Sequence, residues 1–126
     1  MIVIDTSVLI DALTGLKSSG LAVRTALDEG EPILLPALVL YEWLRGPRIA
    51  EELALQESLF PAEAAIPFDK EQAKVSADLY RAVRRARTRE VDLAIAACAL
   101  VHDARLWTLN SADFQDVPGI RLYGPG

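Results

Sequence analysis

The sequence has very few of the residues that build disulfides, zinc sites and phospho-accepting active sites. Its 126 residues include one cysteine (Cys98), one histidine (His102) and three lysines. A single cysteine excludes an internal disulfide and fits a reducing compartment, so we expect a cytoplasmic protein with Cys98 as a small core residue. A single histidine, without a cysteine pair, argues against a typical zinc site.

Long apolar runs are also missing. The longest, ILLPALVLY and LAIAACALV, are far shorter than the ~20 residues that a membrane-spanning helix needs. The first segment lacks basic residues, and Asp5 and Asp11 interrupt its apolar letters, so it does not resemble a signal peptide. No Gly/Ser tract, charge block or repeat divides the chain. We therefore expect a soluble protein with a single domain over residues 1–126.

Apolar strand patterns alternate with helical patterns along the whole chain. This alternation predicts an α/β fold with a mostly parallel central sheet and helices on both faces, a three-layer α/β/α sandwich. Ser18–Gly20 is expected to be a loop, and Thr6 or Ser7 to lie near the start of the first helix. The expected strands are 2–5, 32–36, 64–68, 106–109 and 120–123, and the expected helices are 6–15, 21–30, 37–46, 49–59, 70–87 and 91–101, with a helical turn at 111–115.

Four acidic residues occupy unexpected places in this pattern. Asp5 ends the first strand, Glu42 interrupts the apolar segment LVLYEWL, Asp92 precedes a very apolar helix, and Asp113 follows a strand in TLNSADF. Ligand sites in open α/β sheets form beyond the carboxyl ends of the strands, where three of these acids are expected. The sequence therefore predicts a cluster of carboxylates at that edge.

Each acid also has a simpler interpretation when it is taken alone. Asp5 and Asp113 can cap the helical segments beside them. Asp92 in a first helical turn is favoured by the helix dipole, by about 0.3–1 kcal/mol. Glu42 is harder to explain, because an unpaired carboxylate in an apolar helix is costly, but it can pair with Arg45 or Arg24.

The chemistry of a carboxylate cluster favours a bound cation. Gathered carboxylates repel one another, and a cation is required to keep all of them ionised. Oxygen ligands without histidine or cysteine select Mg²⁺ or Mn²⁺. Mg²⁺ with open water positions is widely used in phosphoryl chemistry, because it lowers the pKa of a bound water and neutralises charge on the phosphate.

The chain resembles the PIN-domain family, and within it the VapC-type toxin ribonucleases. The matching segments are MIVIDTSVLID, EWLRG, REVDLAIAACAL and LWTLNSADF, which occur in the order and at roughly the spacing of the family. The resemblance covers nearly the whole chain. It implies a PIN-like fold, an endoribonuclease that depends on Mg²⁺ or Mn²⁺, a homodimer, and inhibition by a small VapB-type antitoxin.

The resemblance also assigns the site residues. It implies an acidic metal-binding triad with polar neighbours, which fall on Asp5, Glu42 and Asp92, with Thr6 or Ser7 and Thr108 in support. Many family members carry an Asp where this chain has Asn110, so Asp113 is the candidate for a fourth acid. Asn110 is expected to cap the following turn, with Asp113 at its third position, as in a capping box.

The predicted reaction is hydrolysis of an RNA phosphodiester bond by water. Asp5 and Asp92 are expected to bind the principal ion directly, Glu42 to bind through water or to orient the attacking water, and Asp113 to assist a second, weaker ion. Two alternatives stay open: an inactive PIN-like binding module that acts through protein partners, and a phosphatase-type hydrolase. The second needs a lysine near a strand end, and none of the three lysines is well placed.

The distribution of basic residues adds one further expectation. The net charge of −5 argues against indiscriminate nucleic-acid binding, but five of thirteen Lys and Arg residues fall between Arg81 and Arg89. The segment RRARTR is either a solvated helix end or a grip on the RNA backbone. In the second case Arg84, Arg85 and Arg87 are the contact residues.

Overall fold

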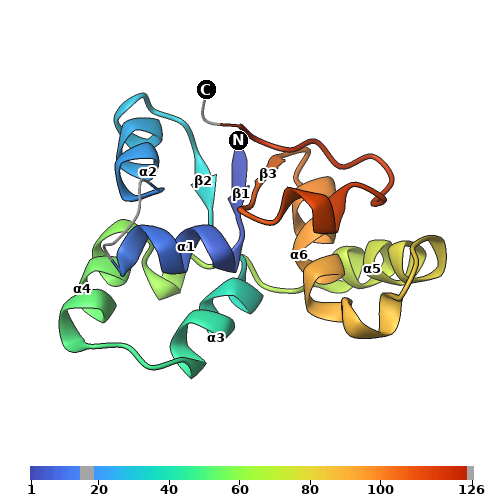
Figure 1. Cartoon of the computed structure of the whole chain (residues 1–126), viewed down its shortest axis with the longest axis horizontal. Helices are drawn as coiled ribbons and strands as arrows, with labels where there is room; N and C mark the ends of the chain where they lie inside the picture. Colours follow the sequence, from blue (N-terminus) through green and yellow to red (C-terminus); the bar gives the residue numbers. More distant parts are fainter. Residues whose placement is uncertain (15–18, 125–126) are drawn as a thin grey trace.

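The computed structural model describes residues 1–14 and 19–124, and it has the predicted α/β architecture. A parallel three-stranded sheet has the order β2-β1-β3. Helices cover both faces, with α1, α2 and α4 on one side of the sheet and α5 and α6 on the other (Figure 1). The strands are β1 (Ile2–Ile4), β2 (Ile33–Leu34) and β3 (Arg105–Trp107); the helices are α1 (Thr6–Leu13), α2 (Ser19–Asp28), α3 (Ala37–Arg45), α4 (Ala50–Leu59), α5 (Lys70–Ala82) and α6 (Glu90–Val101), with 3-10 turns η1 (Ala62–Ala64), η2 (Ala86–Thr88) and η3 (Ser111–Phe114).

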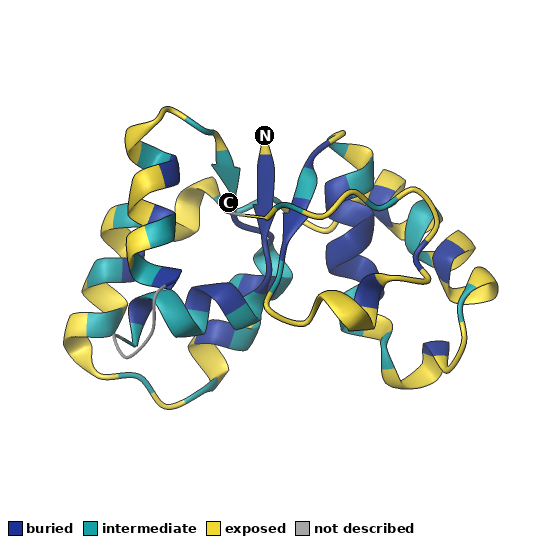
Figure 2. Ribbon diagram, turned by 45° about the horizontal axis from the view of Figure 1, so that its top comes forward, coloured by how far each residue is buried: buried dark blue, intermediate teal, exposed yellow. Residues whose placement is uncertain are grey.

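The core lies where α6 packs against the sheet. All three residues of β1 are fully buried, and α6 is buried continuously from Leu93 to Ala99. Figure 2 shows the dark-blue buried residues concentrated along β1, β3 and α6. A run of small and apolar residues lets α6 lie close to β1, β3 and α5 at once. Because α6 is held in the core along most of its length, its first turn, which contains Asp92, has a fixed position relative to the sheet.

Cys98 is a core residue, as its setting in the Ala-rich segment predicts. Its thiol is fully buried within α6, and burial, with a smaller contribution from the charge of Asp69, raises its pKa to about 12. A thiol with such a pKa is protonated at neutral pH and is a poor nucleophile.

Two of the five expected strands are reduced to single bridges. Segment 64–68 pairs only where Ile66 bridges to Pro36, and segment 120–123 only where Leu122 bridges to Leu106. The first segment is limited because Ala64 closes the turn η1 and Pro67 has no N–H to donate. The sequence therefore predicts correctly that these two segments lie beside the sheet, but wrongly that each forms a full strand.

Two predicted helix boundaries are also wrong. Ser19 and Gly20 belong to the first turn of α2 and not to a loop, while Ser18 lies outside the described residues. The helix expected over 70–87 ends at Ala82, where Val83 turns to extended backbone and Arg85 adopts a left-handed conformation with φ 54°. This break lets the chain reverse so that α6 packs against α5.

Among the helices of residues 1–14 and 19–124, none combines the length and hydrophobicity that crossing a bilayer requires.

Candidate metal centre and active site

The register of the sheet brings Asp5 and Thr108 together. Ile4 of β1 pairs with Trp107 of β3, so the next residue of each strand emerges at the same edge. The backbone N–H of Asp5 donates to the carbonyl of Trp107 at 2.9 Å, which continues the ladder by one step. Asp5 is 4% exposed. The apolar strand therefore delivers a buried carboxylate to the carboxyl edge of the sheet.

Three donors hold the Asp5 carboxylate in one orientation. Its Oδ1 accepts a hydrogen bond from the backbone N–H of Thr6 at 2.8 Å. Its Oδ2 accepts from the hydroxyl of Ser7 at 2.9 Å and from the hydroxyl of Thr108 at 2.7 Å. Asp5 thus occupies the N-cap position of α1. Its capping interpretation is correct, and it is compatible with a metal site because a carboxylate has four lone-pair positions.

Glu42 is held from two sides in α3. The hydroxyl of Thr6 donates to its Oε1 at 2.5 Å, and Nη2 of Arg45 donates to its Oε2 at 3.3 Å. Arg45 is one of the two partners expected from the sequence, and its guanidinium lies 5.2 Å from the ring centroid of Tyr41. Thr6 therefore connects the two acids, because its N–H contacts Asp5 and its hydroxyl contacts Glu42.

Asp92 lies in the first turn of α6, near the other acids. Burial, together with the smaller effects of the negative charges of Asp5, Glu42 and Asp113, raises its pKa to about 6, while the positive charge of Arg89 opposes the rise. Coulomb interactions decline with distance, so these influences indicate that the four carboxylates share one region. The favourable dipole at the start of α6 therefore does not offset the burial of Asp92 and the repulsion from its neighbouring carboxylates.

Asp113 and Asn110 lie at the rim of the site. Asp113 is exposed in η3, and its N–H donates to the carbonyl of Asn110 at 2.9 Å. The side chain of Asn110 makes no capping hydrogen bond, so the predicted side-chain cap is wrong. The reason is geometric: Asn110 has φ −114° and ψ 52°, outside the extended conformation that a capping side chain requires. The hydroxyl of Thr108 accepts from the N–H of Asn110 instead, at 3.0 Å.

The arginines expected to contact RNA line two hollows beside the acids. Arg84, Arg85 and Arg87 are all exposed, in the segment between α5 and α6 and not on a helix end. A hollow of about 380 Å³ is lined by Arg87 together with the acids Glu42 and Asp92. A second hollow, of about 340 Å³, is lined by Arg84, Arg85, Asp113, Asp116, Arg89, Ala112 and Gln115.

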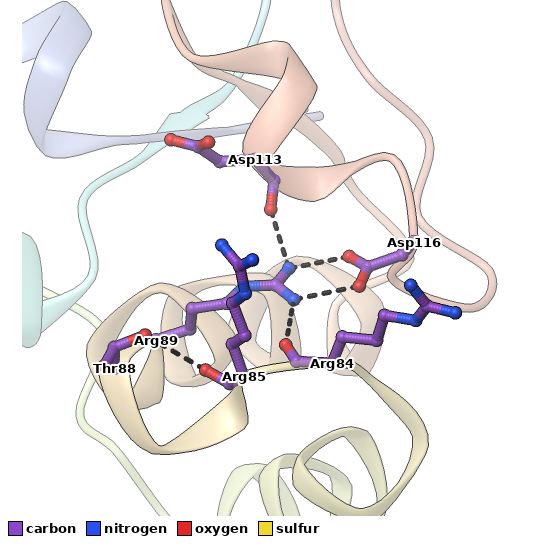
Figure 3. A network of polar contacts seen from close by, with 6 residues as sticks. All are labelled: Arg84, Arg85, Thr88, Arg89, Asp113 and Asp116. Carbon is purple, nitrogen blue, oxygen red and sulfur yellow. Dashed lines mark hydrogen bonds and ion pairs between the residues drawn. The ribbon is translucent and has the colours of Figure 1, made fainter.

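Arg89 is a residue of this region with four hydrogen bonds that the sequence did not single out. Its guanidinium donates to both carboxylate oxygens of Asp116, at 2.7 and 2.9 Å, and to the backbone carbonyls of Asp113 and Arg84, at 2.7 and 2.8 Å (Figure 3). It was one of several arginines in RRARTR, and no local pattern distinguishes the arginine that turns inward. Its position three residues before Asp92 is the only available signal.

The residues present fit a hydrated divalent cation. Within residues 1–14 and 19–124, no three Asp, Glu, His or Cys side chains are close enough together to ligate one metal ion directly. Mg²⁺ does not require three, because it commonly binds one or two carboxylates and keeps several of its waters. Asp5 and Asp92 would supply one buried and one half-buried carboxylate, and Glu42 and Asp113 lie within electrostatic reach of Asp92.

The comparisons with known proteins agree with this fold. Residues 2–120 match the PIN domain, so the chain belongs to the PIN-domain family. It is 32% identical over 123 residues to a protein named Ribonuclease VapC19 of Mycobacterium tuberculosis. The matched region covers 96% of this chain and 98% of that relative. PIN-domain nucleases of the VapC type generally depend on a divalent metal ion.

Solved structures show the same fold at lower sequence identity. A chain of FitAcB from Neisseria gonorrhoeae superposes with a TM-score of 0.73 at 24% identity, covering 99% of this chain and 98% of that one. A chain of VapBC2 from Rickettsia felis, in a complex bound to a DNA fragment from its promoter, superposes with a TM-score of 0.75 at 19% identity, covering 98% of both chains.

Proposed function

We propose that this chain is a metal-dependent endoribonuclease and the toxin of a toxin–antitoxin pair, with Mg²⁺ as its ion and Mn²⁺ able to replace it. The observation that carries this proposal is the convergence of Asp5, Glu42, Asp92 and Asp113 at the carboxyl edge of the sheet. Family membership and the named ribonuclease relative support the same reaction. The single buried Cys98 fits a cytoplasmic location.

Asp5 and Asp92 would hold the cation directly, with Glu42 and Asp113 reaching it through water. When bound, the cation lowers the pKa of a water molecule and neutralises charge on the phosphate that is cut. Thr6, Ser7 and Thr108 act on the carboxylates themselves, because their N–H and hydroxyl groups fix the orientation of Asp5 and Glu42.

The remaining roles belong to Glu42 and the arginines. Glu42 lines the 380 Å³ hollow with Arg87 and Asp92, which supports a role in orienting the attacking water. Arg87 on the wall of this hollow is suited to bind an RNA phosphate, and Arg84 and Arg85 to bind a neighbouring one. No side-chain nucleophile is required, because water attacks the phosphorus atom.

The partners follow from the relatives. VapBC2 of Rickettsia felis was crystallised as a complex, and another structural relative is a toxin–antitoxin complex from Klebsiella pneumoniae. We propose a homodimer that is inhibited by a VapB-type antitoxin. The antitoxin would insert an apolar helix and place an Arg or Lys near the acids, where a positive charge competes with the metal.

Cleavage of total RNA with and without Mg²⁺, followed by mapping of the 5′ ends, tests the function. The wild-type protein should cut only with the metal, and Asp5→Asn should lose at least ~100-fold of the rate, because a charged ligand is replaced by a neutral amide. Asp28→Asn, an exposed position at the end of α2, is the matched control and should cut normally. Full cleavage by purified Asp5→Asn would refute the mechanism, and an inactive wild-type protein would favour the binding module.

A further inference from the structure

Arg89 joins two parts of the site that are 24 residues apart in the chain. We propose that Arg89 is a positioning residue, which with Asp116 forms a clamp that holds η3, and therefore Asp113, against the start of α6 where Asp92 lies. The inference deepens the proposed function, since it matters to catalysis only if Asp113 assists the cation. It assigns no contact with substrate to Arg89.

The geometry of the clamp distinguishes it from an ordinary surface ion pair. Arg89 contacts Asp116 through two nitrogens, 2.7 and 2.9 Å from the two carboxylate oxygens, and its side chain is only 17% exposed. The Asp116 side chain is 45% exposed, and exposed pairs usually contribute little, but the bidentate Arg–carboxylate geometry is the arrangement that does contribute. Two further bonds, to the carbonyls of Asp113 and Arg84, use the second N–H of each of these two nitrogens.

The segment that carries Asp113 has few other anchors. The turn η3 comprises four residues, and 3-10 turns of this length are weak by themselves. Phe114 and Val117 are buried and hold the segment by packing, but Asp113 precedes both and is itself exposed. The Arg89 bond to the carbonyl of Asp113 is therefore the contact that fixes this residue from the side of α6 (Figure 3).

Arg89 could act in a second way, through charge alone. Its positive charge lies close enough to Asp92 and Asp113 to interact with both. A lysine at position 89 distinguishes the clamp from the charge effect, because lysine keeps the positive charge but lacks the two-pronged geometry of arginine. Removing the charge of Asp116 tests the clamp from the other side while it leaves Arg89 cationic.

Three variants and one control of the full-length protein separate these modes. Arg89→Gln removes the charge and the fork together. Arg89→Lys keeps the charge and loses the fork, and Asp116→Asn keeps Arg89 and weakens its partner. Arg121→Lys is the matched control, because Arg121 makes a similar pair, donating at 2.9 Å to the carboxylate and at 2.9 Å to the carbonyl of Asp103. That pair follows the far end of α6 and lies away from the acids.

Two measurements are needed, and neither uses RNA. Amide hydrogen exchange of residues 111–117 without metal reports whether η3 is held, and calorimetric titration with Mn²⁺ reports the affinity of the site. We expect Arg89→Lys and Asp116→Asn to speed exchange in this segment about tenfold, as loss of one charge-assisted hydrogen bond would, and to weaken Mn²⁺ binding about threefold to tenfold. Arg121→Lys should change neither.

The outcomes are distinct from those of the cleavage assay. Unchanged exchange in both clamp variants would overturn the inference. So would faster exchange with unaltered Mn²⁺ affinity, which would leave the contact without a role at the site. An unchanged Mn²⁺ affinity in Arg89→Lys, with a loss only in Arg89→Gln, would assign Arg89 to charge. Failure of RNA cleavage would refute the proposed reaction without altering these readings.

Discussion

At the scale of single residues, Asp92 carries a charge that its surroundings oppose. Burial and three neighbouring carboxylates raise its pKa from the ordinary 3.8 to about 6, and only Arg89 acts in the other direction. The folded chain therefore binds a proton at Asp92 more tightly than the unfolded chain does. The resulting stabilisation is fully present below pH 4 and is lost as the pH rises to about 6.

Asp92→Asn should therefore stabilise the metal-free protein at pH 7.5, and this gain should disappear near pH 4. A rise of the pKa from 3.8 to about 6 corresponds to at most roughly 3 kcal/mol, and solvent screening of this half-buried group reduces the expected gain to about 1 kcal/mol. Urea unfolding in EDTA at pH 4, 6 and 7.5 measures it, with Asp28→Asn as the control. A variant less stable than the wild type at pH 7.5 would contradict the electrostatic interpretation.

Asp113, which lies in η3, and Asn110, the residue just before that turn, are expected to respond differently to substitution. Asp113→Asn should raise the Mg²⁺ concentration needed for half-maximal cleavage several-fold, because it removes one charge from the cluster. Asn110→Ala should change the free energy of unfolding by less than about 0.5 kcal/mol, because the Asn110 side chain makes no capping bond. A Mg²⁺ titration of the cleavage rate and urea unfolding of both variants provide the comparison. If Asp113→Asn leaves the Mg²⁺ curve unchanged, the site has three acids.

At the scale of elements, the proposed function assigns contact with RNA to the connection between α5 and α6. It leaves α5 at Ala82, passes the left-handed Arg85 and the turn η2, and enters α6 at Glu90. A left-handed conformation at a residue other than glycine is uncommon and costs about 1 kcal/mol or more. The bend presents the arginines beside the acids instead of continuing them along a helix.

Replacing Arg84, Arg85 and Arg87 one at a time with Gln should weaken RNA binding for all sequences alike. Each lost phosphate contact should reduce the slope of log affinity against log salt by roughly one. Fluorescence anisotropy with labelled RNA from 50 to 300 mM salt, in EDTA to prevent cleavage, measures the slope. Arg24→Gln, on α2, is the control. A slope that stays constant in all three variants would leave this segment without a role in binding.

The positions of the elements were largely predictable, and their ends were not. Apolar periodicity located α1, α3, α4 and α6 and all three strands, because burial on one face dictates those patterns. Helix 70–87 was overextended because Arg84, Arg85 and Arg87 are good helix formers. The tertiary requirement that α6 pack against α5 overrides this preference, and no local sequence records it.

The same division applies to the site. Asp5, Glu42 and Asp92 could be singled out as candidates because each places a charge in an apolar context, which is visible in the sequence. The hydroxyl of Thr108 lies against Asp5 because the register pairs Ile4 with Trp107. This contact can be predicted only when the strand order and register of the sheet are known. The role of Arg89 depends on a partner 27 residues away, so it could not be deduced from the RRARTR segment.

At the scale of the whole molecule, a toxin of a toxin–antitoxin pair should slow the growth of a host that lacks the antitoxin. Expression of the wild-type chain alone should arrest growth, while Asp5→Asn should be tolerated, because the proposed metal ligand is missing. Co-expression with the cognate small antitoxin should restore growth, and size-exclusion chromatography with light scattering should show the toxin as a dimer. Harmless expression of a soluble protein that cuts RNA in vitro would contradict the toxin assignment and leave the nuclease intact.

The inert thiol in α6 makes the protein a convenient scaffold for site-directed labelling. Cys98 is fully buried with a pKa of about 12, so its thiol should not react with a maleimide dye in the native state. A cysteine introduced at an exposed position such as Gln115 would then be the single reactive group on the folded chain. A fluorophore placed there, at the edge of the arginine-lined hollow, would report the arrival of RNA or antitoxin in real time without any need to remove the native cysteine.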